Sequence, residues 1–139
     1  MAGRETLEGP VVSGFAPLLI SVEQAGSVQV IGVSGEVDLA TAPALATALR
    51  GPAADGADLV VDLSRTSFLD CRGVHLLIEA GTAQRDAGHG FAIACPETGE
   101  VARVLSLIGA AGAYLPLHRS RAAAIAAARR PSEPGVALA

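Results

Sequence analysis

The stretch TSFLDCRGVHLLIEAG, residues 66–81, decides the fold class, because it leads from a buried strand into an amphipathic helix. Just before it, LVVDL at 59–63 is a continuous run rich in β-formers, which is typical of a strand buried on both faces. Asp70 can cap the helix, and the apolar residues after it recur at helical spacing, which predicts a helix over 71–86. This strand-to-helix step predicts one unit of a parallel α/β sheet.

Strands and helices alternate on both sides of this unit. Two apolar runs, 17–26 and 27–39, meet at a cluster of turn residues, which predicts a β-hairpin. The other expected elements are a helix at 41–50 with Thr41 as N-cap and Gly51 past its end, loops at 52–58 and 64–70, a strand at 88–96, a helix from Thr98 to 112, an edge strand at 113–118 and a helix at 120–130. The order is ββαβαβαβα, an α/β fold whose mixed sheet is covered by about four helices.

The length of 139 residues predicts one domain. Residues 1–15 are Gly-rich without periodicity and are expected to be a flexible leader, followed by the domain at 16–130 and a disordered tail at 131–139. No apolar run approaches the roughly 20 residues of a spanning helix. The N-terminus also lacks the basic and apolar regions of a secretion signal. We therefore expect a cytoplasmic protein without a membrane partner.

Composition argues against several functions. The net charge is −4 and all basic residues are Arg, without a basic stripe carrying interleaved aromatics, so we expect no direct nucleic-acid partner. There is no Lys to serve a phosphate-binding loop. The two cysteines and three histidines lack the close spacings of a zinc site. We expect no metal, no cofactor and no enzymatic activity.

Cys71 is the residue that keeps a catalytic alternative open. A thiol in the first turn of a helix, next to Arg72, lies where a thiolate is stabilised. His75 follows one helical turn later and can act as a base. A small thiol enzyme using Cys71 is therefore an alternative function.

Two segments carry a resemblance to a known family. VVDLSRTSFLDCRGVHLLIEA, residues 60–80, resembles the signature of STAS domains, the fold of anti-sigma factor antagonists. VSGEVDLATAPAL, residues 33–45, is similar to the family's other recurrent segment. The resemblance implies a regulator that binds an anti-sigma factor, usually a serine kinase of the histidine-kinase-like ATPase fold, and so releases a sigma factor. The kinase then phosphorylates a Ser in a segment such as Asp-Ser-Ser-Gly, which breaks the complex.

This chain departs from that motif at the phosphorylation site. Asp70 matches the Asp and Gly73 the Gly, but Cys71 takes the first Ser position and Arg72 the second, which is the usual phospho-acceptor. A fixed cation thus replaces a group that would gain about −1.5 to −2 charges. The resemblance further implies that the partner docks on this helix start and on the loop near Asp38. His75 and Glu79 extend that patch along the helix.

Three modes of control remain open on the sequence. The protein can bind its partner constitutively, or Cys71 and Cys95 can form a redox pair, because a right-handed crossover brings neighbouring strand ends together. The third mode is a displaced phosphosite in the preceding loop, at Ser64, Thr66 or Ser67. A ligand-sensing STAS domain, with a nucleotide or lipid near Asp38 and Asp70, is the other alternative function.

Overall fold

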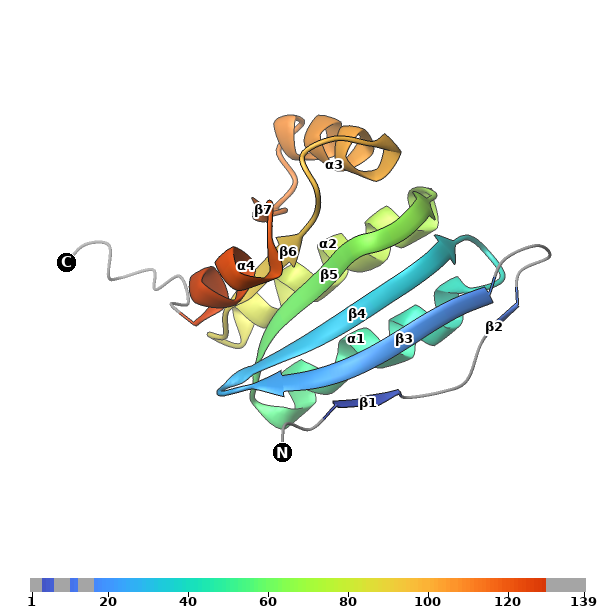
Figure 1. The fold of residues 1–139 in the computed structure, drawn as a ribbon. Helices are drawn as coiled ribbons and strands as arrows, with labels where there is room; N and C mark the ends of the chain where they lie inside the picture. Colours follow the sequence, from blue (N-terminus) through green and yellow to red (C-terminus); the bar gives the residue numbers. More distant parts are fainter. Residues whose placement is uncertain (1–3, 7–10, 13–16, 130–139) are drawn as a thin grey trace.

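A computed structural model describes residues 4–6, 11–12 and 17–129 (Figure 1). The elements in chain order are β1 (Arg4–Thr6), β2 (Val11–Val12), β3 (Pro17–Ala25), β4 (Val28–Val37), α1 (Ala42–Asp55), β5 (Asp58–Leu69), α2 (Cys71–Asp86), β6 (Phe91–Ala94), α3 (Glu100–Ala110), β7 (Leu117–His118) and α4 (Arg121–Ala128). From β3 onward this is the predicted order ββαβαβαβα. Within the described residues, no helix is long and apolar enough to span a membrane.

The sheet is mixed, as predicted. β3 and β4 form the expected antiparallel hairpin, with Gly26 in the turn at a φ of 64°. β4, β5, β6 and β7 then pair in parallel, giving the order β1-β3-β4-β5-β6-β7. The last strand is reduced to Leu117 and His118 at the edge, directly after Pro116, which cannot donate to a ladder.

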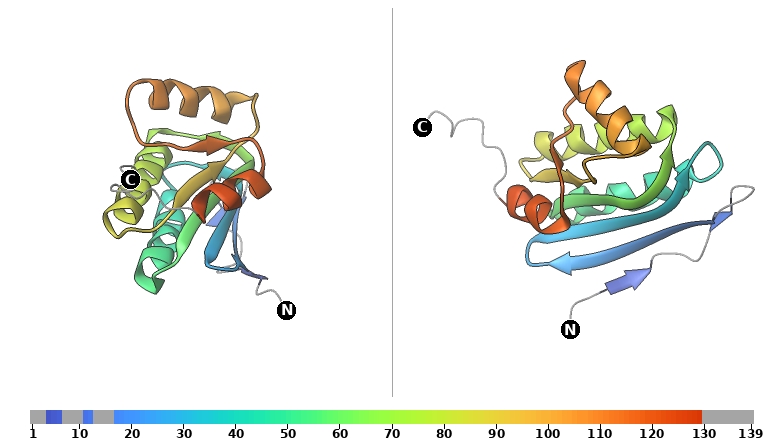
Figure 2. Two further views of the ribbon diagram at one scale, coloured as in Figure 1. Left: turned by 90° about the vertical axis from the view of Figure 1, so that its left-hand side faces the viewer. Right: turned by 45° about the horizontal axis from the view of Figure 1, so that its top comes forward.

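The two faces of the sheet are covered differently. α1, α2 and α3 pack on one face, where alternate strand residues such as Ile31, Val61 and Ile93 build the main core. On the other face α4 covers a smaller cluster that includes Val30, Val60 and Ala92. Figure 2 shows α1 and α2 on one side of the sheet and α4 on the other. The front of β3, β4 and β5 beside α4 is left without a helix (Figure 1).

The N-terminal segment contributes strands that its composition did not predict. β1 and β2 both pair antiparallel with β3, along the edge that the hairpin would otherwise expose. Residues 4–6 and 11–12 are therefore part of the sheet rather than of a flexible leader. The remaining leader residues, and the tail at 131–139, lie outside the described residues.

Two helix boundaries predicted from sequence are wrong. α1 continues through Gly51 and Pro52 to Asp55, and Gly56, whose φ of 69° suits a C-cap, follows it. Proline cannot donate a backbone hydrogen bond within a helix. Pro52 is tolerated here because its side chain is buried, and because α1 continues for only about one more turn. α3 begins at Glu100 after Gly99, so Thr98 is not its cap.

β5 has 12 residues, more than twice the length of the predicted strand at 59–63, and residues 64–69 are not a loop. Residues 64–69 continue β5 and pair with β4 up to Leu69, across two register shifts. Each shift leaves two consecutive residues exposed, so the alternation expected of a strand is lost from the sequence. The extended strand carries the chain to the start of α2.

Gly73 lets α2 begin against the ends of β4 and β5. A Cβ at this position would lie 2.4 Å from Cδ1 of Leu69 and 2.9 Å from Cγ1 of Val37. Only hydrogen fits there, so the glycine fixes how closely the first turn of α2 approaches the strand ends. Gly51 within α1 has open space around the same position.

We expect Gly73→Ala to lower the free energy of unfolding by about 1–3 kcal/mol, because the added methyl overpacks the contact with Leu69 and Val37. Gly51→Ala is the matched control. It should raise the free energy of unfolding by about 0.5–1 kcal/mol, because Ala is the better helix former. Urea denaturation followed by circular dichroism measures both. Equal effects of the two substitutions would contradict the close-packing argument.

An ion-pair cluster ties α4 to the sheet. Nε of Arg121 lies 2.8 Å from Oδ2 of Asp62, and Nη1 of the same guanidinium binds Oε1 of Glu23. Burial alone would raise the pKa of Asp62, but hydrogen bonds from Ser64 and Arg121 outweigh it and hold that pKa below its usual value. The two carboxylates raise the pKa of Arg121 despite its partial burial. Asp62 and Arg121 are therefore both ionised at neutral pH.

We expect Asp62→Asn to lower the free energy of unfolding at neutral pH by about 1–3 kcal/mol, because it removes the charged partner of Arg121. A carboxylate with a lowered native pKa stabilises the fold above about pH 4 and loses this contribution as the pH falls through that pKa. The variant should consequently lose less stability than the wild type between about pH 7 and about pH 3. Asp86→Asn, at an exposed carboxylate, is the control and should keep the wild-type pH dependence in urea titrations.

Candidate functional site

The two acidic residues expected at the site follow neighbouring strand ends. Val37 at the end of β4 pairs with Leu69 at the end of β5, so Asp38 and Asp70 emerge from the same edge of the sheet. The backbone N–H of Asp70 donates to the carbonyl of Val37 at 3.1 Å. The structure thus brings together two loops that are 32 residues apart in the sequence.

Asp70 caps α2 as predicted. Its Oδ1 accepts hydrogen bonds from the backbone N–H groups of Arg72 at 3.0 Å and Gly73 at 3.1 Å. These bonds satisfy two of the N–H groups that a helix start leaves free. The donors to this cap are backbone N–H groups, and the side chains of Cys71 and Arg72 are exposed at the first turn.

The loop after β4 is held by Asp38 and Thr41. Oδ1 of Asp38 accepts from the N–H groups of Ala40 and Thr41, each at 3.0 Å. Thr41 is buried, and its hydroxyl donates to the carbonyl of Glu36 at 2.9 Å while accepting from the N–H of Asp38. Thr41 therefore stands at the N-cap position as predicted, but its side chain orders the loop instead of capping α1.

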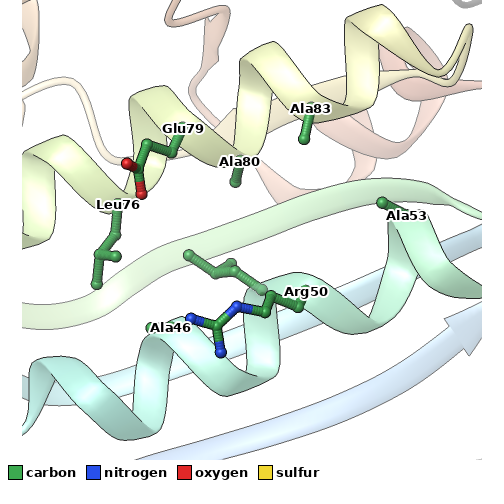
Figure 3. A pocket seen from close by; sticks show the side chains of 8 residues that line it. Ala46, Arg50, Ala53, Leu76, Glu79, Ala80 and Ala83 are labelled. Carbon is green, nitrogen blue, oxygen red and sulfur yellow. The ribbon is translucent and has the colours of Figure 1, made fainter.

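A groove between α1 and α2 holds two adjoining pockets, and Figure 3 shows the one lined by residues such as Ala46, Leu76 and Ala80. The other has a volume of about 490 Å³, and its lining includes Arg50, Arg72, His75 and Glu79. Nε2 of His75 lies 3.0 Å from Oε2 of Glu79 one turn later, and both side chains are exposed. In Figure 3 Glu79 and Leu76 extend from α2 above Arg50 of α1. The predicted surface residues of α2 thus form one wall of this groove.

The structure does not bring Cys71 and Cys95 together. β6 ends at Ala94 opposite Asp62, so Cys95 lies beside Leu63, whereas Cys71 follows the far end of β5. The strand from Leu63 to Leu69 spans about 20 Å at about 3.3 Å per residue. A disulfide needs Cα atoms within about 7 Å. The arrangement of β5 and β6 therefore does not allow a disulfide between Cys71 and Cys95 within one molecule. Both thiols are free, and burial together with the charge of Asp62 raises the pKa of Cys95.

Cys71 also has no base in place. Its thiol is exposed, and among the described residues no hydrogen bond joins it to His75, whose Nε2 faces Glu79. The described residues hold no group of three or more His, Cys, Asp or Glu that could bind a metal ion.

Two exposed apolar residues near these strand ends were missed by the sequence reasoning. Leu39 follows Asp38 and is 72% exposed, and Phe68 near the end of β5 is 43% exposed. The sequence pattern places Leu39 at the end of a predicted strand and Phe68 in a predicted loop, and neither assignment predicts an exposed apolar side chain. The second register shift of β5 places Phe68 opposite Glu36 and turns it away from the core, and this shift is visible only in the folded sheet.

Comparison with known proteins agrees with this architecture. A crystal structure of an anti-sigma factor antagonist from Mycobacterium paratuberculosis is 30% identical, with a TM-score of 0.72, over 89% of this chain and 100% of that chain. A putative anti-sigma factor antagonist from Thermotoga maritima shares the fold at 16% identity and a TM-score of 0.62, over 78% of this chain and 93% of that one. The antagonist SpoIIAA in its unphosphorylated form does so at 16% identity and a TM-score of 0.56, over 75% and 91%.

A search among curated proteins finds no match. The family model described as "Mlab, STAS domain" matches residues 20–118, which is the sheet from β3 to β7 with the helices between. The match covers well over half of the chain and includes both segments that carried the resemblance. The chain belongs to the STAS domain family.

Proposed function

We propose that this protein is an anti-sigma factor antagonist that sequesters an anti-sigma factor, a serine kinase of the histidine-kinase-like ATPase fold, and so releases a sigma factor in the cytoplasm. The binding surface is the edge where β4 and β5 end, called here the helix-start surface. Its members are Asp38, Leu39, Phe68, Asp70, Cys71, Arg72, Gly73, His75 and Glu79. The observation that carries the proposal is the exposure of Leu39 and Phe68 among charged groups at this edge.

The composition of the helix-start surface suits a protein partner. Protein interfaces combine an apolar centre with a charged and polar rim. Leu39 and Phe68 supply the apolar part, and Arg72, His75 and Glu79 supply exposed charged or titratable groups along α2. The loops that carry these side chains are fixed by the hydrogen bonds of Asp38 and Asp70, so little ordering is needed on binding.

Arg72 makes this binding constitutive in our proposal. The guanidinium occupies the usual phospho-acceptor position and has no hydroxyl to phosphorylate. Of the three residues considered for a displaced phosphosite, Thr66 is buried with its hydroxyl donating to the carbonyl of Val33 at 2.8 Å. Ser67 is exposed on β5, but its hydroxyl is 3.3 Å from the carbonyl of Gly35 and it belongs to a strand rather than a flexible loop.

We expect Leu39→Ala to weaken binding of the cognate anti-sigma factor by about tenfold, because it removes an apolar group from the centre of the interface. Isothermal titration calorimetry with the purified kinase measures the change. Leu107→Ala is the matched control, since Leu107 is 61% exposed on α3 and lies outside the surface. If both leucine variants bind like the wild type, the partner does not use this edge.

We expect no kinase-dependent phosphate incorporation at residues 71–73 of the wild-type chain, because Arg72 replaces the acceptor. Arg72→Ser should restore labelling at that residue, since Asp70 and Gly73 keep the backbone of the motif in place. Radiolabelled ATP and mass spectrometry of the modified peptide test this. Arg103→Ser, at an exposed arginine of α3, serves as control and should stay unlabelled. Labelling of the wild type within 71–73 would contradict the proposal.

A further inference from the structure

The face of the sheet opposite α1 and α2 carries a groove that the proposed function does not use. It lies beside α4 on β3, β4 and β5, where Figure 1 shows no helix in front of the sheet. Its volume is about 520 Å³, within the range of small-molecule sites of about 300–1,000 Å³. The polar residues that line it are Ser21, Ser34, Asp62, Ser64, Arg65 and Arg121.

The strand register arranges the floor of the groove in two rows. Leu19, Ser34 and Arg65 are paired across β3, β4 and β5, and Ser21, Gly32 and Asp62 form the next row toward α4. On the covered part of this face the corresponding positions are apolar, such as Val30 and Val60 under α4. The change from valines to serines and glycine is what leaves this part of the face open and polar.

A register shift places Arg65 in the groove. Between the pairs Gly32–Asp62 and Ser34–Arg65, β5 has one residue more than β4. Without that extra residue Ser64 would stand opposite Ser34 and Arg65 would turn toward the core. The shift instead exposes both Ser64 and Arg65 beside the groove. Bulges commonly redirect side chains in this way next to binding sites.

Three donors on this floor have no hydrogen-bond or ion-pair partner among the described residues: the hydroxyls of Ser21 and Ser34 and the guanidinium of Arg65. The hydroxyl of Ser64 is already used, because it donates to Oδ1 of Asp62 at 2.7 Å. Arg121 uses Nε for Asp62 and Nη1 for Glu23, while its Nη2 lies 3.7 Å from the place of a Cβ on Gly32. Nη2 of Arg121 therefore lies above the middle of the groove, near Gly32.

The charges of the groove favour an anion at its Arg65 end. Asp62 and Glu23 are both engaged by Arg121, so the acidic groups at the α4 end are already paired. Arg65 at the other end is a cation with no carboxylate partner among the described residues, and it is paired across the strands with Ser34, whose hydroxyl has no partner among those residues. Leu19, 44% exposed, adds an apolar contact next to these donors.

We propose that this groove binds a small organic anion, a carboxylate or a phosphate ester. Its anionic group is held by Arg65, Ser34 and Nη2 of Arg121, and its carbon skeleton lies on Leu19. Arginine suits both kinds of anion because its planar donors match carboxylate and phosphate oxygens. The volume of the groove accommodates an organic molecule rather than a bare ion. The site lies on the face of the sheet opposite α1 and α2, and its lining residues are different from those of the helix-start surface.

The test is an NMR titration of the isotope-labelled protein with citrate, glycerol phosphate and uncharged glycerol as separate probes. We expect saturable shifts of the amide signals of Ser21, Gly32, Ser34 and Arg65 with citrate or glycerol phosphate, and none with glycerol. Which of the two anions binds more tightly separates carboxylate from phosphate recognition. Arg65→Gln should weaken the binding by at least about tenfold, because it removes the unpaired cation.

Arg103→Gln is the matched control, since it removes an exposed arginine of α3 outside the groove and should leave the titration unchanged. Arg65 is exposed and without a partner among the described residues, so its replacement should not unfold the protein. A thermal melt of each variant verifies this. The proposal is wrong if neither anion shifts these amides at millimolar concentration. It is also wrong if the anions shift mainly the amide signals of the first turn of α2. The same holds if the groove amides respond only to an added anti-sigma factor and to neither anion.

Discussion

The parallel pairing of β4 with β5 is the constraint on which both surfaces of this protein depend. At its far end, the pair Val37–Leu69 sets the loops of Asp38 and Asp70 side by side and gives α2 its starting point. In its middle, the register shift beside Gly32 turns Arg65 onto the face without α1 and α2. β6 stops opposite Asp62, so the second half of β5 relies on β4 for its backbone pairing. A slip of one residue in this ladder would exchange core and surface along that half.

Most of the fold could be predicted from the sequence because strand and helix periodicities are local. The hairpin, the helix at Cys71–Asp86 and its cap by Asp70 are all confirmed. The errors fall where a local signal is overridden by tertiary contacts. The Gly51-Pro52 pair predicts the end of a helix. α1 nevertheless continues for about one more turn to Asp55, because Pro52 is buried. The second half of β5 read as a loop because its bulges remove the alternation that identifies a strand.

The candidate site was predictable only as far as its motif residues. The resemblance placed Asp38, Asp70 and Arg72 at one surface, and the structure brings their loops together. The pairing of Cys71 with Cys95 failed because the crossover rule gives which strands are neighbours but not how far each one runs. Contacts such as Arg121 with Asp62, 59 residues apart, leave no sequence signal at all.

The charge of Arg72 links the structure of the first turn of α2 to the regulation that we propose. A cation in the first turn of a helix opposes the helix dipole, at a cost of about 0.3–1 kcal/mol when exposed. Asp70 reduces this cost because its carboxylate caps the same turn. A phosphoserine at this position would carry about −1.5 to −2 charges. The guanidinium carries +1, so the two groups differ by about 2.5–3 charges at one point of the surface. Under the proposed function, an acidic partner surface that a phosphate would repel would be attracted to Arg72 at all times. The charge of this one side chain is therefore the reason why we propose permanent binding instead of a switch.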